Sequence, residues 1–157
     1  MTPLGLLPDK FSILSASVKA GLALLETWDL SRVRSRVVAR LSLDPKLVSL
    51  AEFEYRRFIS LPALQPCKLY GMPDSIVDEW WHDHLIHSRD YSGLCLQLTG
   101  NYIHHEPAEP NNDSECHDFA LNNTYHDLKY YYGQIREEIW PPLNAVTCKT
   151  CAVCKTG

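Results

Sequence analysis

Histidine side chains are concentrated in one stretch of the sequence, residues 74–107. This stretch reads DSIVDEWWHDHLIHSRDYSGLCLQLTGNYIHHEP and holds five of the seven histidines of the chain, with one cysteine and several carboxylates. Histidine is the commonest protein ligand for metal ions and the usual proton shuttle near neutral pH. We therefore expect any chemistry of this protein to lie in residues 74–107.

Helical spacing limits which of these side chains can bind the same ion. Positions three, seven and eleven apart share a face of a helix, which makes one stripe of His84, His87, Tyr91 and Cys95. His82 and His84 are only two apart and point roughly 160–200° away from each other, so they cannot both bind one ion on a regular helix. Either the helix begins or breaks near His82, or one histidine binds the metal while the other packs or bonds to a carboxylate such as Asp78.

The adjacent pair His104-His105 follows in a segment that we expect to be extended. This pair can return across the end of the helix and complete a site with Cys95. A set of histidines and a cysteine suits zinc, or alternatively iron or copper. The other interpretation is a plain core, in which Trp80 and Trp81 pack and the histidines beside them bond to backbone carbonyls.

The C-terminal segment holds a second group of candidate ligands. Its sequence, CKTCAVCKTG, has a C-x2-C-x2-C pattern formed by Cys148, Cys151 and Cys154. Such a pattern is a zinc or redox half-site, and its fourth ligand would come from a second chain, a histidine, Cys67 or Cys116. The alternative is a flexible tail with reactive thiols. The pair Cys116-His117 is expected in a loop.

Apolar residues recur at helical spacing along most of the chain, and the predicted fold class is all-α. This periodicity, with capping residues and prolines at the ends, predicts helices at 10–27, 31–41, 45–61, 75–98 and 118–138. Residues 62–73 and 106–117 should be connectors, and 101–105 a short extended turn. The predicted architecture is a compact single-domain bundle of about five helices, with a leader over 1–9, a helical domain over 10–142 and a flexible Cys-rich tail over 143–157.

Composition and charge exclude several classes of protein. The 157 residues are 45% apolar and 22% charged, as in an ordinary globular domain, and the formal charge is −4. This charge argues against a general nucleic-acid or anionic-membrane surface, and we expect a solvated helix face at the basic strip of Arg32, Arg34, Arg36 and Arg40. No apolar run reaches the roughly 18–20 residues of a membrane span, and the N-terminus lacks a signal-peptide pattern. The expected location is the cytoplasm, where clustered cysteines are ligands or redox groups rather than disulfides.

Three motifs resemble one known family. The runs EYRRFISL (54–61), VDEWWHDHLIHSRDYSGLC (77–95) and GNYIHHEP (100–107) are similar to the glycine-rich domain-containing protein-like family, over roughly residues 45–142. The matching positions are Asp78, Trp81, His82, His84, Tyr91, Cys95, Gly100 and His105. The resemblance implies a ligand set of His82, His84, Cys95 and His105, with His87, His104 and Asp78 in second place. It implies no particular activity, because the domain of that family has no known biochemical function.

These observations favour a small cytoplasmic helical protein that binds one transition-metal ion, zinc in the first place, between the central helix and the following His-His turn. One alternative is a metal-dependent enzyme, a hydrolase or an oxygenase, whose ion keeps an open position for water or substrate. Another is a metal-free interaction module that uses the Cys tail to hold an unknown protein partner.

Overall fold

The computed structural model describes residues 1–107 and 114–154, apart from the side chains of Ser114, Val153 and Cys154. The described part contains seven α-helices and three strands, together with two short 3-10 helices at Pro3–Gly5 and Leu143–Ala145. The helices are α1 (Pro8–Ser12), α2 (Ala16–Thr27), α3 (Ser31–Leu41), α4 (Pro45–Leu64), α5 (Ile76–Ile86), α6 (Ser88–Thr99) and α7 (Ser114–Tyr132). Within the described ranges no helix is both long and apolar enough to cross a membrane.

Local capping chemistry sets several helix ends where the sequence predicted them. The Asp44 carboxylate accepts a hydrogen bond from the Lys46 N–H at 2.7 Å at the start of α4, and the Ser75 hydroxyl accepts from the Asp78 N–H at 3.3 Å at the start of α5. Gly100 ends α6 with a φ of 78°, a backbone conformation that glycine adopts without strain.

Two helix boundaries differ from the prediction. Helix α4 does not stop before Pro62 but continues to Leu64. A proline within a helix costs about 3 kcal/mol, and burial of the side chains of Leu61 and Leu64 offsets this cost. The predicted helix over 75–98 is two helices, because His87 has non-helical backbone angles of −81° and 58°. Its Nδ1 donates to the Asp83 carbonyl at 2.8 Å and so pairs an acceptor in the last turn of α5.

The all-α prediction is incomplete, because a small antiparallel sheet joins the helices. Its strands are β1 (Tyr70–Pro73), β2 (Ile103–Pro107) and β3 (Cys148–Cys154), in the order β1-β3-β2. The segment that we expected to be a flexible tail is therefore the middle strand, with Cys148, Cys151 and Ala152 buried. The last helix also begins earlier than predicted, at Ser114.

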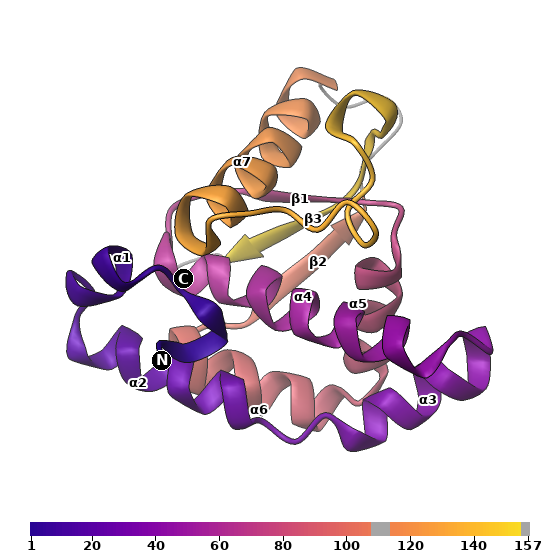
Figure 1. Ribbon diagram of the computed structural model, residues 1–157, viewed down its shortest axis with the longest axis horizontal. Helices are drawn as coiled ribbons and strands as arrows, with labels where there is room; N and C mark the ends of the chain where they lie inside the picture. Colours follow the sequence, from indigo (N-terminus) through magenta and orange to yellow (C-terminus); the bar gives the residue numbers. More distant parts are fainter. Residues whose placement is uncertain (108–113, 155–157) are drawn as a thin grey trace.

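The sheet lies between two helical layers. Figure 1 shows α7 on one side of the strands and α4 and α5, with α2, α3 and α6 beneath them, on the other. The core is continuous from α2 and α4 to the sheet, and its largest fully buried side chains include Trp80, Trp81, Trp140, Tyr55 and Tyr91. Both faces of the sheet are thus covered, and side chains on either face can meet helical residues.

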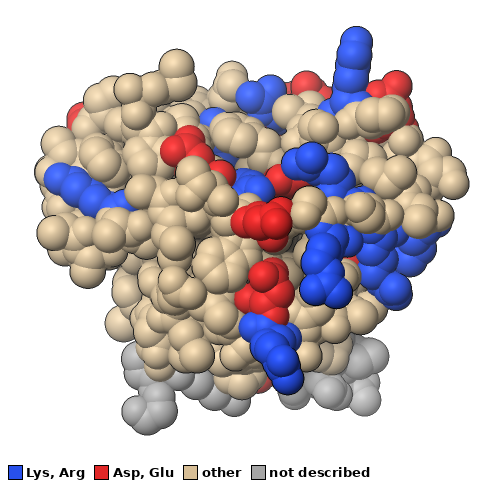
Figure 2. Space-filling view, turned by 90° about the horizontal axis from the view of Figure 1, so that it is seen from below, with Lys and Arg blue, Asp and Glu red and all other residues tan. Residues whose placement is uncertain are grey.

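The basic strip of α3 is a solvated helix face held by ion pairs. Three of its four arginines contact carboxylates of other helices within 3.0 Å, in the pairs Arg34–Glu52, Arg36–Asp83 and Arg40–Glu79. In the view from below, most Lys and Arg side chains gather on one side, next to a central run of Asp and Glu (Figure 2). The pairing offsets the charge of three of the four arginines of this strip.

Candidate metal sites

The first group of candidate ligands joins α5 to β2. Asp78 and His82 are one helical turn apart on α5, and the His82 Nδ1 lies 3.4 Å from Asp78 Oδ2. His105 on β2 brings its Nε2 to 3.6 Å from Asp78 Oδ1. One ligand atom from each of the three residues lies within 4.8 Å of the other two. The group therefore contains two of the four ligands predicted first, His82 and His105, with Asp78 from the second set.

Two buried polar atoms of this group lack hydrogen bonds. Neither Asp78 Oδ2 nor His105 Nε2 has a hydrogen-bond partner among the described residues. Thr150 donates to the other carboxylate oxygen, Oδ1, at 3.3 Å. The Lys149 Nζ is 3.2 Å from Asp78 Oδ2 as an ion pair, without the geometry of a hydrogen bond. Buried polar atoms are nearly always paired, so each of these two atoms requires an explanation.

The carboxylate of Asp78 is charged at neutral pH. Burial by itself would raise the pKa of Asp78, but the two imidazoles and the Lys149 ammonium beside it lower that pKa below its ordinary value. A charged, buried carboxylate beside two imidazoles is a favourable arrangement for a divalent cation, which binds deprotonated ligands.

His84 and Cys95, the other two residues of the predicted ligand set, do not join this group. His84 is fully buried, with its Nδ1 2.8 Å from the Tyr55 hydroxyl and its Nε2 2.7 Å from Asp90 Oδ2. Both ring nitrogens are engaged, so neither is open to an ion. Cys95 is buried in α6 and lies near Tyr91, whose pKa is raised by its burial and by Cys95. The two-residue spacing of His82 and His84 separates them, as helical geometry requires.

The two remaining histidines of the stretch also point elsewhere. His87 bonds to the Asp83 carbonyl, as described above. The His104 ring packs against Tyr102, with 4.9 Å between ring centroids. Because successive strand residues alternate between the faces of a sheet, His104 and His105 lie on opposite faces of β2.

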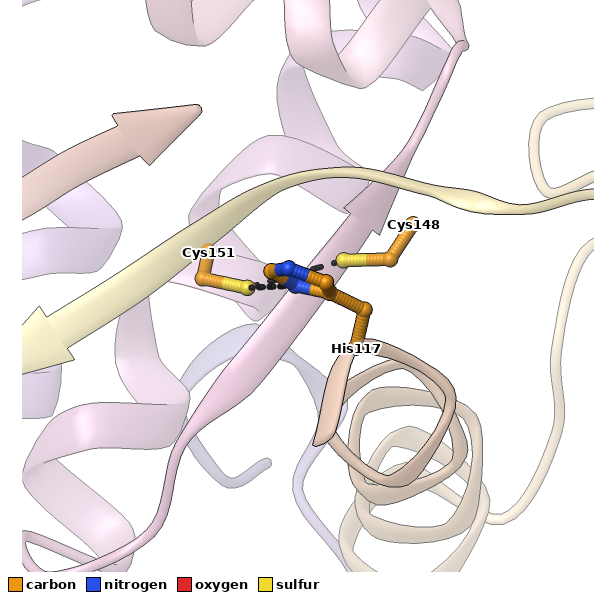
Figure 3. Close-up of side chains that lie close together, drawn as sticks. All are labelled: His117, Cys148 and Cys151. Atoms are coloured by element: carbon orange, nitrogen blue, oxygen red, sulfur yellow. Dashed lines mark hydrogen bonds between the residues drawn. The ribbon is translucent and has the colours of Figure 1, made fainter. Parts of the chain in front are cut away.

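A second group of candidate ligands lies on the other face of the sheet. Figure 3 shows Cys148 and Cys151 on β3 and His117 on α7 pointing toward one another. The two sulfur atoms are 3.6 Å apart, and the Cys151 Sγ is 3.6 Å from the His117 Nδ1. Sequence reasoning considered a histidine as an additional ligand but placed His117 in a loop. The side chain of Cys154, the third cysteine of the motif, lies outside the described residues.

A β-bulge places Cys148 and Cys151 on the same face. Residues three apart on a regular strand face opposite sides of the sheet. Here Met72 pairs with Thr150 and Pro73 pairs with Cys148, so Lys149 is an extra residue without a partner on β1. The bulge shifts the alternation by one position and turns both thiols toward α7.

Polar contacts hold α7 against β1 and so position His117. The buried Asp127 accepts hydrogen bonds from the Tyr70 hydroxyl at 2.6 Å and from the Lys68 ammonium at 2.9 Å. Thr124 donates to the Gly71 carbonyl at 2.6 Å, and Asn123 donates to the Leu69 carbonyl at 3.0 Å. These bonds tie two adjacent turns of α7 to β1 and to the two residues that precede it.

Replacing Asp127 by asparagine should reduce the loss of folding stability that the protein undergoes as the pH falls from neutral to acid. Burial alone would raise the pKa of Asp127, but hydrogen bonds from Tyr70, Lys68 and His126 lower it below its ordinary value of 3.8. The stabilisation by this carboxylate is therefore complete above the ordinary pKa and is lost as the pH falls through the lower pKa of the folded state. Urea unfolding from about pH 7 to about pH 3 should show the variant less stable at neutral pH and approaching the wild type in acid.

The exposed Asp118 on the same helix supplies the control, because Asp118→Asn should change stability little at any pH. A deficit of Asp127→Asn that is as large in acid as at neutral pH would contradict this assignment.

Comparison with known proteins identifies one family model, described as UCP032817-like, that matches residues 23–132. No curated protein matches the chain, and no solved structure does. The matched region contains Asp78, His82, His105 and His117, whereas Cys148 and Cys151 follow it. The description does not confirm the family name that the motifs suggested.

Proposed function

The chain belongs to the UCP032817-like family, and because that description names no activity, we propose a function from the side chains themselves. We propose that the protein binds one transition-metal ion, zinc in the first place, between α5 and β2. Its ligands are Asp78, His82 and His105. The observation that carries the proposal is the pair of buried atoms without hydrogen bonds, Asp78 Oδ2 and His105 Nε2.

The separations within the group fit a small tetrahedral ion. With zinc about 2.0–2.2 Å from nitrogen and oxygen ligands, tetrahedral geometry puts neighbouring ligand atoms about 3.4 Å apart. The observed N···O separations are 3.4 Å from the His82 Nδ1 to Asp78 Oδ2 and 3.6 Å from the His105 Nε2 to the other carboxylate oxygen, Oδ1. One ligand atom from each of the three residues lies within 4.8 Å of the other two. An ion at this position would supply the missing partner of both atoms without a large movement of the strand or the helix.

Lys149 is the one neighbouring group that opposes a cation. Its ammonium lies 3.2 Å from Asp78 Oδ2 and also 3.2 Å from Asp74 Oδ1. The lysine side chain is 43% exposed and flexible, so it can keep the Asp74 contact and leave Asp78 when an ion binds. Metal binding at this site should accordingly release Lys149 toward solvent.

A second candidate function is metal-dependent catalysis by a hydrolase or an oxygenase. Among the described residues the group offers three protein ligands, and the His82 side chain is 38% exposed. Three ligands with solvent access are typical of catalytic zinc sites, and two histidines with one carboxylate are also the ligand set of iron oxygenases. X-ray absorption of the loaded protein decides between the functions: a water-derived ligand favours catalysis, and four protein ligands exclude it.

Loss of one ligand should remove the ion from this site. We expect Asp78→Asn and His105→Gln each to weaken Zn²⁺ binding by at least about 100-fold, since even outer-shell partners of a metal site contribute 10–100-fold. Untagged protein would be loaded with Zn²⁺ and measured by plasma mass spectrometry, with affinities from competition against a coloured chelator. Each variant should carry one ion fewer per chain than the wild type.

His104→Gln is the matched control, because His104 is the neighbour of His105 and faces the opposite side of β2. Its zinc content should equal that of the wild type. Unchanged zinc in both ligand variants would refute this site, and a wild-type protein that takes up no zinc would favour the metal-free interaction module instead.

Two finer points belong to this proposal. The WHxH and HHEP motifs support a relation to the glycine-rich domain-containing protein-like family. The clustered cysteines support a cytoplasmic location, where thiols stay reduced. Of the ligands first predicted, His84 and Cys95 are left out of the proposed set for the reasons given above.

A further inference from the structure

We propose that His117, Cys148 and Cys151 form a second, structural zinc site, which joins the C-terminal strand β3 to α7. This site is independent of the one between α5 and β2, because it lies on the opposite face of the sheet and shares no ligand with it. Thiolate and imidazole are the preferred ligands of structural zinc.

The distances in the group match the edges of a zinc tetrahedron. Zinc bonds of about 2.3 Å to sulfur and about 2.0–2.1 Å to nitrogen place two sulfurs about 3.8 Å apart and a sulfur and a nitrogen about 3.6 Å apart. The observed values are 3.6 Å between the sulfurs and 3.6 Å from the Cys151 Sγ to the His117 Nδ1. Both cysteines are free thiols, and their 3.6 Å contact is compatible with two thiolates that share one ion.

Three separate features of the fold converge on this arrangement. The bulge at Lys149 turns both thiols to one face. Gly71 lets α7 approach the strand, since a Cβ at this position would meet the Cys148 sulfur at 2.8 Å and the Leu121 nitrogen at 2.6 Å. The first turns of α7 then carry His117 to the two sulfurs. Ligands from elements far apart in the sequence are what a zinc ion needs in order to stabilise a fold.

Cys116 is the candidate for the fourth ligand. It precedes His117 on α7 and its side chain is exposed, outside the group of three as the structure stands, so its thiol would have to turn toward the ion. With three thiolates and one imidazole the site would be a closed Cys₃His centre, the pattern of structural rather than catalytic zinc.

Cobalt(II) distinguishes the two sites by spectroscopy, because only a site with thiolates gives sulfur-to-cobalt charge-transfer absorption in the near ultraviolet. Co²⁺ titration of the reduced full-length protein should produce this band. Cys148→Ser and Cys151→Ser should abolish it, and Cys116→Ser should weaken it. Asp78→Asn should leave the band intact while removing the ion of the first site, so failure of one proposal is separable from failure of the other.

Cys67→Ser is the matched control, since Cys67 is an exposed thiol outside the group, and the band should persist in this variant. Absence of the band in wild-type protein that is folded and fully reduced would overturn the second site.

A measurement on the wild-type protein covers the case in which the serine variants do not fold. Iodoacetamide labelling, mapped by mass spectrometry, should modify Cys67 at the same rate with Zn²⁺ and with a chelator. Cys148 and Cys151 should be protected with Zn²⁺ and labelled faster with the chelator. Equal labelling of these two thiols under both conditions would overturn the proposal.

Discussion

Replacing Glu54 by glutamine is expected to destabilise the protein by about 3–5 kcal/mol, because removal of one partner from a buried ion pair leaves an uncompensated charge. Glu54 is 1% exposed in the middle of α4. Its carboxylate accepts hydrogen bonds from Arg57 at 3.2 Å, from Arg136 at 3.0 Å and from the Trp140 indole at 2.9 Å. Arg57 is itself 5% exposed and cannot turn to water when its partner loses the charge.

Urea or thermal unfolding followed by circular dichroism measures this loss. Glu138→Gln removes an exposed carboxylate that lies between Arg136 and Trp140 in the sequence, and it should change stability by less than about 0.5 kcal/mol. If Glu54→Gln were as mild as its control, the cluster would contribute little net stability. In that case the charges would serve mainly to fix the position of Trp140 over α4.

Local chemistry explains why most helices could be predicted from the sequence. The start of α4 needs only Asp44 and the proline after it, and the start of α5 needs only the Ser75 hydroxyl. The end of α6 needs only the glycine at position 100. Each of these signals acts within a few residues, so it is visible without knowledge of the fold.

The sheet could not be predicted in the same way, because β3 depends on partners that are distant in the sequence. Its residues pair with Tyr70–Pro73 on one side and with Ile103–Pro107 on the other. The segment itself is short, contains a lysine and has little apolar alternation. Its burial results from the pairing and from the cover of α7, which no local pattern indicates.

The candidate sites were predictable only in part, for a related reason. The helical period separated His82 from His84. The His-His turn was expected to return to the end of the central helix at Cys95, whereas His105 lies against His82 in α5. The role of Asp78 was underestimated, because its missing hydrogen bond becomes apparent only in three dimensions. His117 was placed in a loop, and the adjacent cysteine at 116 was the one signal that could have pointed to it.

Gly71→Ala is expected to cost about 3 kcal/mol, at the upper end of the effect of overpacking a core. An added Cβ would lie 2.6 Å from the Leu121 nitrogen and 2.9 Å from the Leu121 Cα. These atoms belong to the backbone of α7, so the clash cannot be relieved by a side-chain rotation, and the helix itself must shift. The shift should also carry His117 away from Cys148 and Cys151, and so weaken the sulfur-to-cobalt absorption.

Gly93→Ala provides the matched control within a helix. A Cβ at this position of α6 would meet only the ring of Trp28, at 3.9 Å and 4.0 Å. Because alanine loses less conformational entropy than glycine, the change should stabilise the protein by about 0.5–1 kcal/mol. Unfolding curves should therefore show Gly71→Ala to be less stable, and Gly93→Ala more stable, than the wild type. Cobalt titrations should show a reduced thiolate band only in Gly71→Ala. Equal stability of both variants would mean that α7 does not pack against β1 as closely as the contacts of Gly71 require.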